Sequence, residues 1–292
     1  MRTTLIAALW LVVTGAVSWA QPPAAHIVGG DSSFVIRAGD TVTGIAAQFG
    51  VSATQLVELN QLRRPNHLVA GETVAIRNPH LAIVERDVAI TINVAQRMLF
   101  LVEGDRVTGY PVTVGSREWP TTLGRFTVID KEIDPAWDVP VSIQREMARQ
   151  GKPVITRMAP SAQNPLGSRW LRLSLPGLGI HGTNAPASIY RYASHGCIRL
   201  HPDHIVELFE RIAVGASGIL VYQPVIVAMI DGQVWLEAHP DPYAREPDAV
   251  PRLRGFADAH GVNASIDWTA VGAALRRRDG LATNVTRRSD AQ

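Results

Sequence analysis

Short alternating segments, separated by turn residues, run through the middle of the chain and constrain its fold most strongly. Strand-like segments follow one another at Val88–Val94, Met98–Val102 and Arg106–Val114, and Gly104-Asp105 marks the turn between the last two. A further segment, Leu123–Ile129, has the same character. Short strands with turn signals at this interval are typical of a β-sandwich or a barrel. We therefore predict a mostly β domain of the sandwich or barrel-like kind.

A different pattern, two short helices between two strands, occupies residues 33–78. Apolar side chains repeat at helical spacing from Val42 to Phe49, and Ser52 is placed to cap a second helix. Strand-like residues flank the helices at Phe34–Arg37 and Thr73–Ile76. This order predicts a small α+β module with a βααβ arrangement, which precedes the mostly β domain.

Residues 1–20 have the pattern of a secretory signal peptide. Arg2 is followed by an apolar stretch, Leu5–Val17, and then by small residues near Ala20. The apolar stretch is shorter than the roughly 20 residues that a membrane-spanning helix needs. We expect cleavage after Ala20, export, and a mature protein without a membrane span.

Three other segments are assigned less structure by their composition. Residues 21–32 contain a Pro-Pro pair and a Gly-Gly pair and are interpreted as a linker. Residues 130–165 are rich in proline and form either a lid over a site or a plain surface excursion. Residues 224–292 are predicted to form a hairpin, which turns at Asp231-Gly232, and a weakly ordered extension.

The charge balance and the cysteine count exclude several kinds of site. The formal net charge is only +2, so no strong positive field argues for nucleic acid as a partner. One cysteine and scattered histidines do not show the ligand spacing of a zinc site. We expect no metal and no other cofactor, and a single cysteine allows no intramolecular disulfide.

The single cysteine, Cys197, lies in a polar stretch of sequence SHGCIRL. A lone thiol near imidazoles is a candidate nucleophile, and His181 and His195 are the candidate bases. The thiolate is the reactive form, and a neighbouring imidazolium can lower the thiol pKa. Gly196 lets other groups approach the sulfur and supplies an unhindered backbone N–H, as an oxyanion hole requires. The alternative is a structural cysteine, because free cysteines are often buried.

A helix is predicted directly after this stretch. Pro202 suits its first turn, and Gly215 is placed to end it. Between them an apolar stripe recurs at helical spacing. We expect this helix to brace the loop that carries the thiol.

Two motifs of this region resemble the active-site signature of the YkuD-type L,D-transpeptidases. They are His181-Gly182-Thr183 and Ser194-His195-Gly196-Cys197-Ile198-Arg199-Leu200. The resemblance extends upstream through Asn164-Pro165-Leu166-Gly167 and Leu171-Arg172-Leu173, and it covers roughly residues 88–223. The family consists of cysteine enzymes of bacterial cell-wall peptidoglycan. The resemblance therefore implies an L,D-transpeptidase with a mostly β catalytic domain.

Residues 33–78 resemble a LysM domain. The resemblance is carried by Ile36-Arg37-Ala38-Gly39-Asp40-Thr41, Ile45-Ala46, Leu59-Asn60 and Gly71-Glu72-Thr73. LysM domains bind glycans that contain N-acetylglucosamine in a groove between two loops, which correspond here to residues 39–43 and 62–68. The alternative is a small folding unit whose groove no longer binds glycan.

The resemblance assigns catalytic roles to individual residues. Cys197 is the nucleophile, and His181 is the base. A backbone carbonyl just after this histidine, that of Gly182, orients its imidazole. His195 has a supporting role, and the backbone N–H groups of His195, Gly196 and Cys197 make the oxyanion hole.

Substrate binding falls to Arg199, Ser194 and Thr183. A guanidinium at Arg199 can clamp a substrate carboxylate with two hydrogen bonds, and the alternative is a structural salt bridge. Ser194 is expected to shape the loop by hydrogen bonding rather than to react.

The partners that the resemblance implies are peptidoglycan stem peptides and glycan strands in the periplasm. The donor is a stem tetrapeptide that ends in D-alanine, which is released when a thioester forms. The acceptor is a second stem amine, a lysine of a lipoprotein, or water. A cell-wall peptide hydrolase or carboxypeptidase and a non-catalytic wall-binding protein are the alternative functions. A carbapenem is expected to acylate Cys197, because its strained lactam imitates the donor amide.

Overall fold

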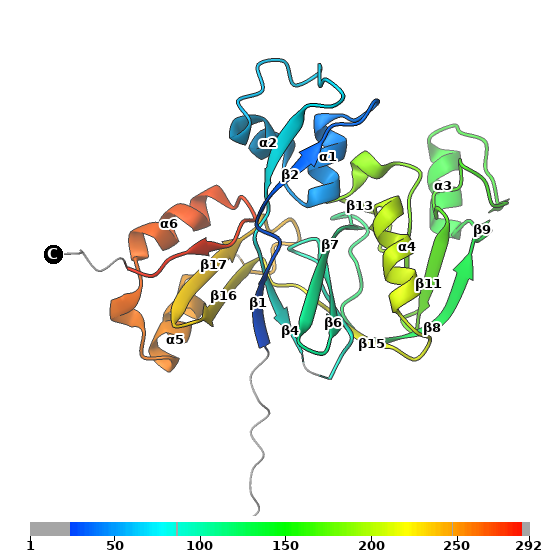
Figure 1. Cartoon of the computed structure of the whole chain (residues 1–292). Coiled ribbons are helices and arrows are strands. Elements are labelled where there is room, and N and C mark those ends of the chain that lie inside the picture. Colours follow the sequence, from blue (N-terminus) through cyan, green and yellow to red (C-terminus); the bar gives the residue numbers. More distant parts are fainter. Residues whose placement is uncertain (1–23, 86, 247, 288–292) are drawn as a thin grey trace, which may run out of the picture.

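The computed structural model describes residues 24–85, 87–246 and 248–287. The predicted signal peptide lies outside the described residues, and so does the end of the chain from residue 288. Figure 1 shows a small N-terminal module at the top, a central β unit, and a C-terminal unit at the left. In the described ranges, no helix combines the length and the apolar character needed to cross a bilayer.

The N-terminal module has the predicted βααβ order. It consists of β2 (Asp31–Val35), α1 (Val42–Phe49), α2 (Ala53–Leu59) and β3 (Thr73–Arg77). The two strands pair in antiparallel fashion. Ser52 caps α2 through a reciprocal capping box, in which its side chain accepts the Gln55 N–H and the Gln55 side chain accepts the Ser52 N–H. The module buries an apolar cluster of its own.

The predicted linker over residues 21–32 is wrong for its described part. Residues Ala24–Val28 form strand β1, which pairs in antiparallel fashion with β4 (His80–Val84). Gly29 and Gly30 then turn the chain into β2 with φ values of 74° and 131°, which L side chains rarely adopt. The glycine pair is thus a tight turn between two strands rather than a flexible spacer.

The central unit is a sheet that closes on itself, as the mostly β prediction required. Its ring order is β7, β14, β12, β11, β8, β15, β5 and β6, and pairing of β6 with β7 closes the ring. Strand β13 adds to the edge of β7. The strand bounds are β5 Ile90–Asn93, β6 Met98–Glu103, β7 Arg106–Gly115, β8 Gly124–Ile133, β11 Arg169–Leu173, β12 Gly179–His181, β13 Tyr192–Ser194, β14 Ile198–Leu200 and β15 Ser217–Val221.

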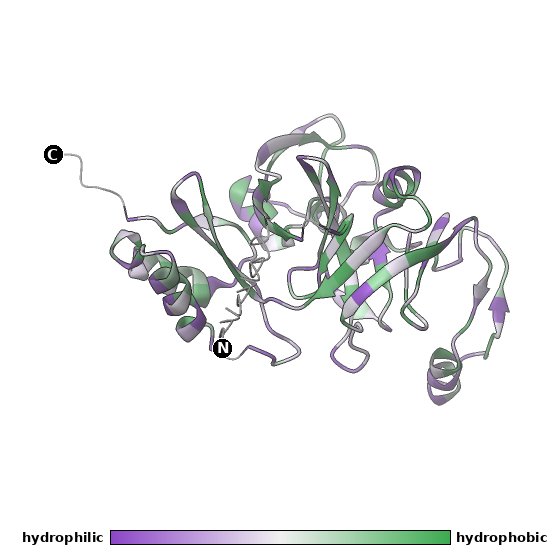
Figure 2. Ribbon diagram, turned by 90° about the horizontal axis from the view of Figure 1, so that it is seen from below, coloured by the Kyte–Doolittle hydropathy of each residue, from purple (hydrophilic) through white to green (hydrophobic). Residues whose placement is uncertain are grey.

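Apolar side chains from all parts of the ring form one buried cluster. The helix predicted after the thiol stretch is α4 (Pro202–Arg211), and its Ile205 and Leu208 are fully buried in that cluster. In Figure 2 green residues are prominent on the strands of the central unit. Helix α4 therefore exists where the sequence predicted it and packs on the core of the ring.

The proline-rich segment forms a small unit of its own at the edge of the ring. It contains β9 (Trp137–Asp138), α3 (Val141–Arg149) and β10 (Arg157–Met158), and β9 pairs with β10. No residue of α3 is buried. The segment projects from the body of the protein at the right of Figure 2. Few contacts therefore hold α3 in place.

The C-terminal unit corrects the prediction of a weakly ordered extension. The predicted hairpin exists as β16 (Val225–Ile230) and β17 (Gln233–Ala238). Two helices, α5 (Val250–Ala259) and α6 (Trp268–Arg277), pack on it and bury a separate apolar cluster. Strand β18 (Thr283–Asn284) extends the hairpin to three strands. A short 3-10 helix, Asn263–Ser265, lies between α5 and α6, and another, Pro186–Ser188, precedes β13. The apolar periodicity of these helices is weak in sequence because each buries only two residues.

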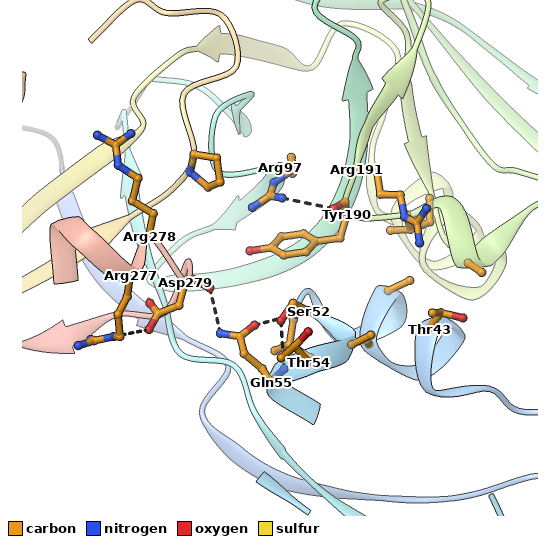
Figure 3. Close-up of a pocket in the computed structure, with 17 residues that line it drawn as sticks. Thr43, Ser52, Thr54, Gln55, Arg97, Tyr190, Arg191, Arg277, Arg278 and Asp279 are labelled. Carbon is orange, nitrogen blue, oxygen red and sulfur yellow. Dashed lines mark hydrogen bonds and ion pairs between the residues drawn. The ribbon is translucent and has the colours of Figure 1, made fainter. Parts of the chain in front are cut away.

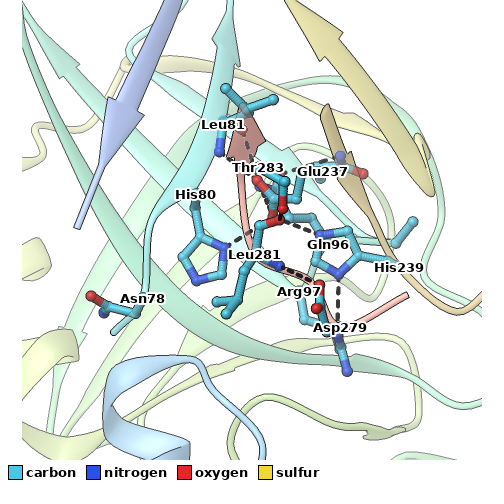
Figure 4. A network of polar contacts seen from close by, with 12 residues as sticks. Asn78, His80, Leu81, Gln96, Arg97, Glu237, His239, Asp279, Leu281 and Thr283 are labelled. Atoms are coloured by element: carbon cyan, nitrogen blue, oxygen red, sulfur yellow. Dashed lines mark hydrogen bonds and ion pairs between the residues drawn. The ribbon is translucent and has the colours of Figure 1, made fainter. Parts of the chain in front are cut away.

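A buried carboxylate joins the C-terminal unit to β4 and to the central unit. Glu237 of β17 is fully buried and lies 2.9 Å from His80 Nδ1, 2.7 Å from His239 Nε2 and 2.9 Å from Gln96 Nε2 (Figure 4). It also accepts the backbone N–H of Leu81. Burial alone would raise the Glu237 pKa, but His80 and the hydrogen bonds outweigh it and lower the pKa to about 2. The carboxylate thus stays ionised where β4, the β5–β6 turn and β17 meet.

Candidate active site

Two adjacent parallel strands bring the predicted nucleophile and base together. In the pairing of β12 with β14, Ile180 lies opposite Ile198 and His181 lies opposite Arg199. Side chains alternate along a strand, so His181 and Arg199 share one face. Cys197 immediately precedes β14. The isoleucines are fully buried on the other face and anchor both strands in the core. The pairing thereby places the imidazole of His181 beside the guanidinium of Arg199, at the end of the strand that Cys197 precedes.

His181 is held in one orientation by its own backbone. Its Nδ1 lies 2.7 Å from the Gly182 carbonyl oxygen, and because a carbonyl only accepts, Nδ1 carries the proton. The neutral ring then offers Nε2 as a proton acceptor. Trp170 covers the ring at a centroid distance of 5.5 Å, and a Cβ on Gly182 would lie 3.2 Å from Ile205. The predicted orienting role of Gly182 therefore has a geometric basis.

The protonation state of His181 follows from its surroundings. Its side chain is buried, and burial, followed by the nearby Arg199 charge, lowers its pKa to about 3. Both causes disfavour the imidazolium. At neutral pH His181 is therefore an uncharged base.

Cys197 is partly exposed, and its Sγ lies 3.6 Å from the Gly177 carbonyl oxygen. Burial raises the pKa of the thiol, and Arg199 opposes that shift. Burial therefore acts against the predicted lowering of the thiol pKa by an imidazolium. Burial thus favours the uncharged form of both the thiol and the imidazole.

The loop before the sulfur is shaped by Ser194. Its hydroxyl donates to the Cys197 carbonyl at 2.6 Å and accepts the Gly196 N–H at 3.1 Å. Gly196 has a φ of 111°, a conformation open to glycine. The Gly196 N–H is thus engaged within the loop, unlike the predicted oxyanion hole, in which it was one of three free donors.

Thr121 and Tyr243 support this loop, and the sequence motifs did not reveal them. The Thr121 hydroxyl donates to the Gly196 carbonyl and accepts the Gly115 N–H, each at 2.8 Å. The Tyr243 hydroxyl donates to the Gly115 carbonyl at 2.8 Å and accepts the Thr121 N–H at 3.2 Å. The C-terminal unit therefore reaches the residue before the nucleophile through two side chains.

His195 faces the proline-rich segment. Its Nε2 lies 2.6 Å from Glu146 Oε2 on α3, and its ring lies 5.3 Å from that of Trp119. The hydrogen bond from His195 lowers the pKa of Glu146, which favours an ionised carboxylate. This contact connects α3 with the loop that carries Cys197. Of the two predicted roles of residues 130–165, a lid over the site requires such a contact and a plain surface excursion does not.

The two remaining predicted residues, Arg199 and Thr183, differ in their polar contacts. Arg199 Nε is buried without a hydrogen-bond partner, and among the described residues the side chain has no ion pair. Thr183 is buried, and its hydroxyl accepts the Ala185 N–H at 3.0 Å, so it shapes the following turn. Within the parts of the chain that the structure describes, no group of three or more His, Cys, Asp or Glu side chains could hold a metal ion.

Comparison with known proteins gives two domain matches. Residues 87–227 match the YkuD family, described as L,D-transpeptidase catalytic domain, and residues 34–77 match the LysM domain. Escherichia coli "Probable L,D-transpeptidase ErfK/SrfK" is 29% identical, with 93% of this chain and 91% of that protein covered. Bacillus licheniformis "Putative L,D-transpeptidase YkuD" is 30% identical over 60% of this chain and 90% of its own length. Among solved structures, L,D-transpeptidase 3 from Mycobacterium tuberculosis aligns with 53% of this chain and 76% of its own at 17% identity and a TM-score of 0.35.

Proposed function

Because the chain belongs to the YkuD family of L,D-transpeptidases, we propose that it is an exported peptidoglycan transpeptidase whose nucleophile is Cys197. The observation that carries this proposal is the shared face of β12 and β14. There the Gly182 carbonyl fixes the proton on His181 Nδ1, which leaves Nε2 as a base on the strand that pairs with the one directly after Cys197. A structural cysteine would need no such oriented neighbour.

The first half-reaction forms a thioester. Cys197 Sγ attacks the carbonyl of the L-centre of a stem tetrapeptide, while His181 Nε2 takes the thiol proton. The backbone N–H groups of His195 and Cys197 are the donors proposed for the oxyanion, since that of Gly196 is engaged by Ser194. The C–N bond to D-alanine then breaks, and the imidazolium returns its proton to the leaving amine.

The second half-reaction transfers the acyl group. An acceptor amine attacks the thioester and loses a proton to His181, the C–S bond breaks, and the thiol is restored. Arg199 is proposed to bind a carboxylate of the stem peptide, because its guanidinium has no ion pair in the described residues and lies beside the reacting groups. Glu146 and His195 are proposed to close α3 over the bound peptide.

The LysM domain is proposed to hold the glycan strand, and the periplasmic face of the cell wall is the proposed location. The acceptor is the open part of the proposal: a second stem amine gives a 3-3 cross-link, a lipoprotein lysine gives an anchored protein, and water gives a carboxypeptidase. Reaction of purified stem tetrapeptides followed by mass spectrometry separates the first outcome from the third. A dimer that lacks one D-alanine supports the transpeptidase, and a free tripeptide alone supports the carboxypeptidase. Unchanged tetrapeptide, together with an unmodified protein, would refute both.

A further inference from the structure

A cavity of about 460 Å³ lies where the three units meet (Figure 3). The LysM domain contributes α1 and the start of α2, the catalytic unit contributes Ile189–Arg191, and the C-terminal unit contributes Arg277–Asp279. Its volume falls within the range of small-molecule sites. Of the two loops expected to bind glycan, only Thr43 reaches it. Cys197 does not line the cavity, and the glycan loops touch it only through Thr43.

The cavity concentrates positive charge. Arg97, Arg191, Arg277 and Arg278 line it, and Asp279 is the carboxylate among the lining residues. Arg277 Nε pairs with Asp279 Oδ2 at 2.8 Å, which leaves the other guanidinium groups without an ion pair among the described residues. The formal net charge of the whole chain is only +2, so this excess is a local feature. Arginine forks of this kind suit carboxylate or phosphate groups.

A buried hydroxyl in the cavity lacks a partner. Tyr190 is only 8% exposed, and its Oη makes no hydrogen bond. A Cβ on Gly280 would lie 3.0 Å from this oxygen, which places the hydroxyl against the C-terminal segment. In Figure 3 the ring extends across the cavity toward Arg278 and Asp279. An unsatisfied buried hydroxyl costs about 1–3 kcal/mol, so a ligand that accepts from it would recover this free energy.

The backbone is strained at the same place. Arg97, Tyr190 and Arg278 have φ values of 58°, 63° and 46°, which non-glycine residues rarely adopt. The Arg97 guanidinium stacks on the Tyr190 ring at 4.1 Å and lies 3.2 Å from His239 Nδ1. Strain of about 1–3 kcal/mol per residue persists where the surrounding structure enforces it, and it clusters at functional sites.

We propose that this cavity binds the carboxylate groups of an anionic peptide, with Arg191 and Arg278 as the ion-pairing residues and the Tyr190 hydroxyl as a further donor. The choice of a peptidoglycan stem peptide as the source of those carboxylates rests on the proposed function. Because the cavity wall comes from three units, the bound peptide fixes the LysM domain against the catalytic unit. It also holds a second stem peptide near the enzyme while the glycan lies in the LysM groove.

The test is hydrogen exchange of the mature chain that carries Cys197→Ala, titrated with a sugar-free stem tetrapeptide. The sugar-free probe avoids the glycan groove, and the substitution prevents turnover. We expect protection of α2 and of residues 277–280, segments that line the cavity but not the thiol loop. Adding either Arg191→Gln or Arg278→Gln is expected to weaken the apparent affinity about tenfold or more, because a charge-assisted hydrogen bond is lost.

Arg276→Gln is the matched control, because it removes the same charge from α6 at an exposed position outside the cavity. It is expected to leave the affinity unchanged. Equal loss with Arg276→Gln, protection confined to the thiol loop, or equal protection by inorganic phosphate at the same concentration would each overturn the assignment. Acylation of the unsubstituted protein is measured separately, so a failed acylation refutes the proposed function without affecting this result.

Discussion

The pH dependence of acylation tests the charge states assigned to His181 and Cys197. A base is active in its neutral form, and the neutral form of His181 predominates above its pKa of about 3. Burial keeps the Cys197 thiol protonated by raising its pKa above the ordinary value. Between these two pKa values His181 stays neutral and the Cys197 thiol stays protonated. The acylation rate is therefore expected to be independent of pH through the mildly acidic and neutral range.

The size of the effect follows from the two titration curves. An imidazole with the ordinary pKa of about 6.5 would be roughly 9% neutral at pH 5.5 and roughly 91% neutral at pH 7.5, a tenfold change in rate. With a pKa of about 3, more than about 99% of His181 is neutral at both pH values. The rate ratio between these two conditions is therefore expected to be close to one.

The assay measures how fast the protein opens the lactam ring of a carbapenem in a single turnover, followed by absorbance. The carbapenem is chosen so that none of its groups titrates between about pH 5.5 and 7.5. Arg199→Gln is a useful companion, because Arg199 is the second cause of the low His181 pKa and burial remains the first. In this variant we expect the pH below which acylation is lost to rise, but to stay below the ordinary histidine pKa of about 6.5. A roughly tenfold loss at pH 5.5 in the unsubstituted protein would refute the buried neutral base, and a rate that rises about tenfold per pH unit would indicate direct attack by a small thiolate population.

Three further predictions concern the supporting contacts. Tyr243→Phe leaves the Gly115 carbonyl and the Thr121 N–H without their shared partner. We expect a loss of about 1–2 kcal/mol in the free energy of unfolding together with slower acylation. Unchanged acylation would show that the loop does not depend on the Tyr243 hydrogen bonds. Glu237→Gln removes a buried, ionised acceptor, and urea unfolding should show a loss of about 3 kcal/mol at pH 7. Because the folded pKa of Glu237 is depressed, its stabilisation is present above the unfolded value of about 4.5 and disappears as the pH falls toward about 2, so the two proteins should converge at low pH; a difference that persists there would contradict the charge argument. Glu146→Gln should speed amide exchange in α3 and raise KM for the tetrapeptide more than it lowers kcat, and an effect confined to kcat would mean that His195 acts in the chemistry instead.

The parts of the fold that the sequence predicted are those with strong local patterns. The helices Val42–Phe49 and Ala53–Leu59 carry an apolar stripe or a cap, and the turn at Asp231-Gly232 has both residues at positive φ, as a tight hairpin requires. The strands of the central ring were recognisable from alternation and turn residues. Local signals of this kind do not depend on distant partners.

The misses depend on contacts between distant residues. Strand Ala24–Val28 exists because it pairs with His80–Val84, and a short segment beside a Gly-Gly turn gives little sign of such a partner. Thr121 and Tyr243 act through one another across more than a hundred positions, so neither has a local motif. The ionisation of His181 was also hidden, because burial rather than sequence spacing sets it.

Intact-mass measurement of the mature protein after incubation with a stem tetrapeptide tests the central assignment most directly. The protein should gain the mass of the tetrapeptide less D-alanine, on a peptide that contains Cys197, and the Cys197→Ala variant should gain nothing. An adduct of the same mass on the variant, or consumption of the tetrapeptide by the variant as fast as by the native protein, would show that the sulfur is not the nucleophile.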